Sequence, residues 1–170
     1  VSSRNLSIDG QVPFQEAENL AFRYVQGWNI VTAGNGTEDY QFYFEQGRTY
    51  RLRLEVTSGE MGIIIQDMQD TLQVLNEAYR KINMAIGGEV DTYRDYQFDK
   101  RIPDVLALLE KEQAALKEQY DRVVCLTGQT SSDVVILDKL YRQLQQMTND
   151  PRKIATLFSS FKSNIGTMGT

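Results

Sequence analysis

Residues 60–86 read EMGIIIQDMQDTLQVLNEAYRKINMAI, and their pattern predicts a long helix around which the rest of the fold is built. Apolar side chains recur in it at alternating steps of four and three residues. They are Met61, Ile65, Met68, Leu72, Leu75, Tyr79, Ile82 and Ile86. The spacing predicts an amphipathic helix about 40 Å long at ~1.5 Å per residue. The run Thr57-Ser58-Gly59-Glu60 offers a capping box at its start, and Gly87-Gly88 offers a stop.

Three more helices are predicted downstream. The second runs from about Lys100 to Thr127, with Pro103 in its first turn and Gly128 at its end. Ser131 or Ser132 caps the third, and Asp150-Pro151 starts the fourth. Their apolar stripes are Ile102, Val105, Leu109, Leu116, Tyr120 and Val123, then Val134, Leu137, Tyr141, Leu144 and Met147, then Ile154, Phe158, Phe161, Ile165 and Met168. Consecutive amphipathic helices predict an antiparallel four-helix bundle over residues 60–170.

Residues 1–59 follow a period of two instead, which is typical of strands. Leu6 and Ile8 precede Asp9-Gly10, and Val12 and Phe14 follow, which predicts a hairpin. A second hairpin is predicted between Gln41–Phe44 and Tyr50–Val56, with Tyr50, Leu52, Leu54 and Val56 on a half-buried face. The predicted fold class is therefore α+β, with a small antiparallel β-sheet before the bundle.

Composition excludes several kinds of chemistry. The 170 residues contain no histidine and only one cysteine, Cys125, which removes imidazole-dependent triads, most transition-metal sites and disulfides within the chain. Cys125 itself is expected to be a buried small hydrophobe. Asp91, Asp95 and Asp99 lack the glycine and the final glutamate of a calcium-binding EF-hand loop. We therefore expect no cofactor and no metal, and an enzyme is disfavoured.

Charge and hydropathy bear on the partners. Eighteen Lys and Arg stand against 23 Asp and Glu, a net charge of -5, which argues against nucleic acid as a partner. No run of 18 apolar residues occurs, so the sequence predicts no transmembrane segment.

The link between the first two helices is a candidate ligand or partner site. It runs from Gly87 to Asp99, longer than the ~2–8 residues usual in bundles. Tyr93, Arg94, Asp95 and Tyr96 could supply contact area and directional hydrogen bonds there. The alternative is that Tyr96 and Phe98 plug the open end of the bundle while Arg94 and Asp95 pair or cap.

A second candidate site is a set of aromatic residues in the β-rich segment. Trp28, with Tyr24 and Tyr40 nearby in sequence, could form a platform on which a sugar ring stacks. The alternative is that a lone tryptophan in a small β-unit forms its core.

The sequence also resembles a known family. LSIDGQVPFQEA at residues 6–17, FRYV at 22–25 and FYFEQG at 42–47 resemble the β-rich N-terminal region of large extracellular solute-binding proteins of bacterial carbohydrate ABC importers. A helical insertion in those proteins is similar to YRDYQFDK at 93–100, PDVL at 103–106, FKSNIG at 161–166 and MGT at 168–170.

This resemblance implies a lipid-anchored or secreted protein of the cell envelope. Residues 1–59 would be an incomplete part of a galactose-binding-like β-sandwich, interrupted by the bundle at 60–170. The chain would then be a fragment of a larger protein whose two-lobed sugar-binding domain lies elsewhere in the parent chain.

The function expected from these observations is that of a non-catalytic accessory or scaffolding module. Its partners would be protein, either the rest of the parent chain or transporter components. The alternative is a carbohydrate-binding module that holds a glycan with exposed aromatic residues, and an enzyme is the third class.

Overall fold

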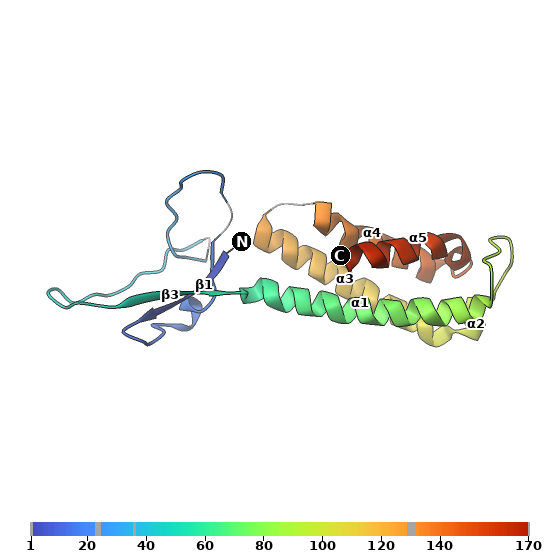
Figure 1. Cartoon of the computed structure of the whole chain (residues 1–170), viewed down its shortest axis with the longest axis horizontal. Helices are drawn as coiled ribbons and strands as arrows, with labels where there is room; N and C mark the ends of the chain where they lie inside the picture. Colours follow the sequence, from blue (N-terminus) through green and yellow to red (C-terminus); the bar gives the residue numbers. More distant parts are fainter. Residues whose placement is uncertain (1, 23–24, 36, 129–131, 170) are drawn as a thin grey trace. The chain divides into compact units, whose positions relative to one another are not determined.

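The computed structural model describes residues 2–22, 25–35, 37–128 and 132–169, without the side chains of residues 132 and 133 (Figure 1). The chain divides into two compact units. The sheet unit comprises Val1–Ile63 together with Leu126–Gly128, and the helical unit comprises Ile64–Cys125 together with Gln129–Thr170. Each unit is described by itself below.

The sheet unit is built on a three-stranded antiparallel sheet. Strands β1 (Ser2–Ile8), β2 (Leu20–Phe22) and β3 (Leu52–Thr57) lie in the order β2-β1-β3. In the register, Arg4 lies opposite Leu20 on one side and Leu6 lies opposite Leu54 on the other. A short 3-10 helix, Gln15–Ala17, precedes β2. The N-terminal sheet expected from the sequence is therefore present.

The predicted hairpins are only partly right. The Asp9-Gly10 turn forms, with φ of 51° and 83°. It is closed by an isolated bridge between Ile8 and Gln11 and not by a pair of strands. The second predicted hairpin is wrong, because residues 41–44 form no strand and β3 pairs with β1. Two aromatic side chains there pack on Phe14 instead: the ring centroids of Tyr40 and Phe42 lie 5.4 and 5.3 Å from that of Phe14, while Tyr43 is exposed.

The face of β3 is exposed rather than half buried, contrary to the expectation. Leu52 and Leu54 are each 59% exposed and Val56 is 75% exposed. The buried apolar residues of the sheet are on the other two strands: Leu6 of β1 and Leu20 of β2 pack with Ala17. The apolar surface of the sheet is thus closed at β1 and β2 and open at β3.

The helical unit contains four long helices and one short one. They are α1 (Gly59–Ile86, which begins in the sheet unit), α2 (Phe98–Arg101), α3 (Pro103–Thr127), α4 (Ser132–Asn149) and α5 (Lys153–Met168). Figure 1 shows the long helices alternating in direction. As residue numbers rise along α1, those of its polar partners in α3 fall, in the pairs Asp67–Arg122, Thr71–Gln119 and Lys81–Asp104. The predicted antiparallel four-helix bundle is confirmed.

The buried face of α1 differs from the predicted stripe. Thr71, Ala78 and Ala85 are buried on it together with Ile64, whereas Ile65 is 49% exposed. The predicted stripe counted only large apolar residues and so omitted Thr71, Ala78 and Ala85. Small side chains are buried where helices pack closely against one another. The stripe of α5 is buried as predicted, with only Met168 partly exposed.

The helix ends largely follow the sequence signals. Gly87 ends α1 at a φ of 76°, and its amide donates to the carbonyl of Asn83 at 3.1 Å. The predicted helix from Lys100 is broken at Ile102 (φ -138°, ψ 53°), so α3 starts at Pro103. Asp150 accepts the backbone N–H of Arg152 at 3.3 Å, although regular α5 begins at Lys153. Ser131, one of the two proposed caps of α4, lies outside the described residues.

Candidate functional site

The aromatic residues that end the α1–α2 link belong to the core. Tyr96 and Phe98 are 4% and 2% exposed, and their rings stack with centroids 5.2 Å apart. Both contact the buried cluster formed by the helices. The Tyr96 hydroxyl accepts a hydrogen bond from the backbone amide of Asp91 at 2.9 Å, which ties the loop to the buried ring. Tyr96 therefore cannot offer an open ring face to a ligand.

The other residues of this link order the loop or lie in solvent. The Arg94 guanidinium carbon lies 5.1 Å from the centre of the Tyr96 ring, over the ring face. Asp95 accepts the backbone N–H of Gln97 at 2.9 Å, at a residue whose φ is 51°. Tyr93 is 99% exposed. Of the four predicted site residues here, Tyr93 and Arg94 have the side chains that a ligand could contact most readily.

The aromatic residues proposed as a stacking platform in the sheet unit lie in different environments. Trp28 is fully exposed, so the alternative in which it forms the core of the β-unit is wrong. Tyr40 packs edge-on against Phe14, and its backbone amide donates to the carbonyl of Ala33 at 2.7 Å. Tyr24 lies outside the described residues. Of the two described members of this set, Trp28 is therefore the one with an open ring face.

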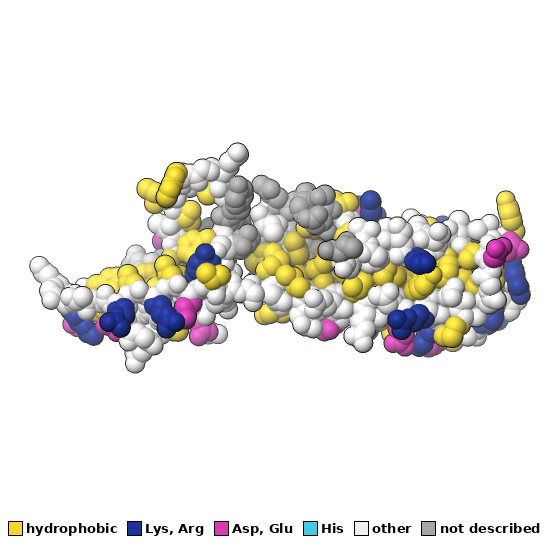
Figure 2. Space-filling model, viewed as in Figure 1, with side chains coloured by type: hydrophobic (Ala, Val, Ile, Leu, Met, Phe, Trp, Pro, Cys, Tyr) yellow, Lys and Arg dark blue, Asp and Glu magenta, His cyan; other side chains and the backbone are white. Residues whose placement is uncertain are grey.

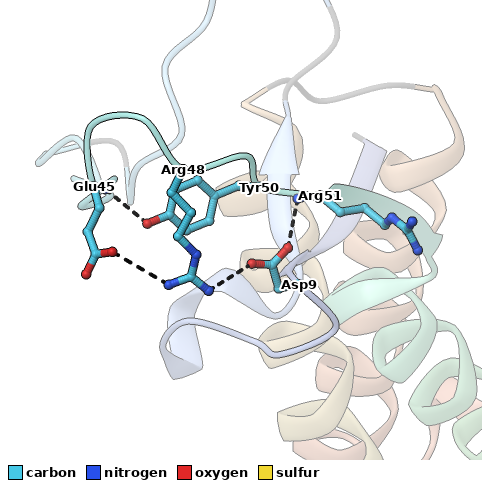
Figure 3. A network of polar contacts seen from close by, with 5 residues as sticks. All are labelled: Asp9, Glu45, Arg48, Tyr50 and Arg51. Carbon is cyan, nitrogen blue, oxygen red and sulfur yellow. Dashed lines mark hydrogen bonds and ion pairs between the residues drawn. The ribbon is translucent and has the colours of Figure 1, made fainter.

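A polar network in the sheet unit was not anticipated from the sequence (Figure 3). Asp9 accepts the backbone N–H of Arg51 at 2.9 Å and pairs with the Arg48 guanidinium at 3.4 Å. Arg48 also lies 3.8 Å from a carboxylate oxygen of Glu45 and over the ring of Tyr50. The network fixes the 45–51 turn onto the Asp9-Gly10 turn. No sequence motif marks this network, because it depends on a contact between two turns that are distant in the sequence.

A groove of about 820 Å³ lies between α3 and α4. Polar and apolar atoms both line it, from residues that include Lys117, Asp121, Cys125, Tyr141 and Thr148. The Lys117 ammonium lies 2.5 Å from Asp121, and this hydrogen bond raises the lysine pKa. Cys125 is exposed here, so the expectation that it is buried is wrong.

A smaller groove of about 380 Å³ lies between α1 and α3. Its buried wall includes Thr71 and Gln119, and the Gln119 side-chain amide donates to the Thr71 hydroxyl at 2.9 Å. The carbonyl oxygen of that amide has no hydrogen-bond partner among the described residues. Asp67, at the rim, accepts a hydrogen bond from Arg122 at 2.8 Å.

The described residues offer neither a metal-binding cluster nor a membrane-spanning helix. No group of three or more cysteine or carboxylate side chains in the described ranges is placed to hold a metal ion. None of the helices in the described part of the chain has both the length and the hydropathy needed to cross a membrane.

Comparison with known proteins identifies one family. Residues 63–167 match the family described as the 4-helix bundle domain of bacterial solute-binding proteins, a range that extends from the first turns of α1 almost to the end of α5. No curated protein and no solved structure matches the chain. The matched range covers nearly all of the four long helices that form the antiparallel bundle, and the chain belongs to this family of solute-binding protein domains.

Proposed function

We propose that the chain is a non-catalytic accessory module of a substrate-binding protein at the cell surface that serves carbohydrate uptake. Residues 1–59 and 60–170 are its two domains in this proposal. The observation that carries it is the use of Tyr96 and Phe98, the aromatic residues at the most prominent candidate site, as core residues of the bundle. Membership of a solute-binding protein family supplies the transport setting.

The surface of the bundle carries ion pairs, including Lys81–Asp104 at 3.2 Å and Arg142–Asp138 at 2.9 Å. A protein contact on this surface would place such pairs at its polar rim. The partner in this proposal is the rest of the parent chain or a component of the transporter. The parent protein would be extracellular or in the cell envelope, and a lipid anchor would belong to the parent protein.

Uptake by cells tests the accessory role. In a strain whose importer uses the parent protein, replacement of residues 60–170 by a short flexible linker should reduce uptake of the transported sugar at an unchanged level of surface protein. Tyr43→Ala serves as a control that leaves the bundle intact, because this side chain lies in the sheet unit and is exposed. Unchanged uptake after the deletion would contradict an accessory role in transport.

A second candidate function is that of a carbohydrate-binding module, which the exposure of Trp28 and Tyr93 favours. Uncovered aromatic rings supply the flat apolar surface on which sugar rings stack. Affinity electrophoresis of the chain through a panel of soluble polysaccharides would detect such binding, and Trp28→Ala or Tyr93→Ala should abolish it.

Tyr43→Ala is the matched control for this second function, because Tyr43 is also exposed, at 87%, but was not part of the predicted site. Tyr96→Ala is unsuitable, since removing a buried ring would unfold the bundle locally. If none of the polysaccharides retards the chain, and its circular dichroism spectrum shows that it is folded, a glycan-binding role is rejected.

A further inference from the structure

Strand β3 has a free edge whose backbone groups can be assigned. The sheet order places β3 at one edge, next to β1 alone among the described strands. The Asp9 amide donates to the Arg51 carbonyl at 2.9 Å, directly before the β1–β3 ladder. Hydrogen-bonded residues alternate along an antiparallel pair. Residues 53 and 55 therefore bond to β1, and residues 52, 54 and 56 direct their N–H and C=O groups outward.

The outward-bonding residues also carry the uncovered apolar side chains. Leu52, Leu54 and Val56 are 59%, 59% and 75% exposed, and Figure 2 shows hydrophobic side chains along the sheet unit with charged ones beside them. On the other face of the strand, Arg53 and Glu55 form an ion pair at 2.6 Å. An exposed apolar edge of this kind is a template for pairing with another strand.

The sequence of β3 is complementary to itself in one antiparallel register. With a two-fold axis at Leu54, this residue faces its own counterpart, Leu52 faces Val56, and Arg53 faces Glu55. Opposite charges across a strand pair stabilise it and like charges destabilise it. An axis one residue away, at Arg53 or at Glu55, would set two like charges directly opposite each other. The register at Leu54 also makes the outward N–H and C=O groups of residues 52, 54 and 56 hydrogen-bonded pairs.

We propose that β3 pairs antiparallel with β3 of a second copy of the chain, around a two-fold axis at Leu54. Two three-stranded sheets then join into one continuous sheet. The same residues supply both sides of the contact, as a closed two-fold dimer requires. Its ladder satisfies the outward backbone groups, and the leucine and valine side chains of the two edges cover one another.

Sedimentation velocity of the whole chain over a range of concentrations tests the proposal. The wild-type chain should show a reversible monomer–dimer equilibrium. Leu54→Pro removes an N–H that does not bond to β1, so it should abolish the dimer while the β1–β3 ladder remains. A wild-type chain that stays monomeric at every concentration would overturn the proposal. A chain that stays monomeric and pairs with a different protein would overturn it as well.

A charge-exchange cycle keeps the test independent of whether the proline variant folds. Arg53→Glu and Glu55→Arg each create two like-charge pairs across the axis, and each should weaken dimerisation about tenfold. The double variant restores both opposite-charge pairs, so its dimer should return to within about threefold of the wild-type affinity. Single variants that dimerise as well as the wild type, or a double variant no better than either single one, would refute pairing in this register.

Discussion

The buried polar pair between α1 and α3 gives a sharp prediction about stability. Thr71 and Gln119 are each 4% exposed, and one hydrogen bond of 2.9 Å joins them. The Gln119 carbonyl oxygen already has no partner among the described residues. Thr71→Val keeps the shape of the side chain and removes the hydroxyl that accepts the Gln119 amide N–H among the described residues. A buried polar group without a partner costs about 1–3 kcal/mol, so the free energy of unfolding should fall by that amount.

Replacing both partners should reverse most of this loss. In Thr71→Val/Gln119→Leu, apolar groups of similar volume fill the same space and no polar atom remains unpaired, a change that can be nearly neutral or stabilising. The double variant should therefore be more stable than Thr71→Val alone, with a coupling of about 1–3 kcal/mol between the two positions. Gln143 is a useful contrast, because its amide oxygen and nitrogen both have partners, in Asn164 and Ser160.

Urea unfolding followed by circular dichroism of the helices measures these differences, since the midpoint and slope give the free energy of unfolding. Thr92→Val, at an exposed position of the α1–α2 link, is the matched control and should leave the midpoint unchanged. An unaltered midpoint for Thr71→Val, or a double variant less stable than Thr71→Val, would show that the buried hydrogen bond does not stabilise the bundle.

Three further predictions follow from the helical unit. Phe98→Ala should lower the free energy of unfolding by about 3–5 kcal/mol because it leaves a cavity, whereas Tyr93→Ala should change it by less than about 0.5 kcal/mol; urea unfolding compares them. Gly87→Ala should cost about 1 kcal/mol, since the φ of 76° disfavours a side chain, and a lower thermal midpoint would report it. The hydrogen bond from Lys81 lowers the Asp104 pKa below its ordinary 3.8. The stability that this pair adds is therefore present above pH 3.8 and is lost as the pH falls through the lower pKa of the folded state. The difference in unfolding midpoint between the wild type and Asp104→Asn should shrink over the same fall in pH.

The helices could be predicted from the sequence because their signals are local. The apolar spacing and Gly87 together predicted that α1 ends at Ile86, and Gly128 predicted the end of α3 at Thr127. The polar core positions Thr71 and Gln119 could not be predicted in the same way, since a stripe counts only apolar residues. Their burial depends on the facing helix, which the pattern of one helix does not describe.

The strands show where local reasoning stops. Alternation located β1 and β3, but the partner of each strand is a contact between distant residues, and β3 pairs with β1 rather than with residues 41–44. Exposure has the same origin: Tyr96 is buried and Trp28 is open because of what packs against them. The candidate site was therefore predicted as a set of residue types, and the structure assigns those residues to core, loop or solvent.

The accessory role makes its most direct claim about where the transported sugar binds. Isothermal titration of that sugar into the purified parent protein, with residues 60–170 present or replaced by a linker, measures the contribution of the bundle to binding. Equal dissociation constants, within about threefold, are the predicted result. A loss of affinity of about tenfold or more on removal of the bundle would contradict the account, because the bundle would then take part in binding the sugar.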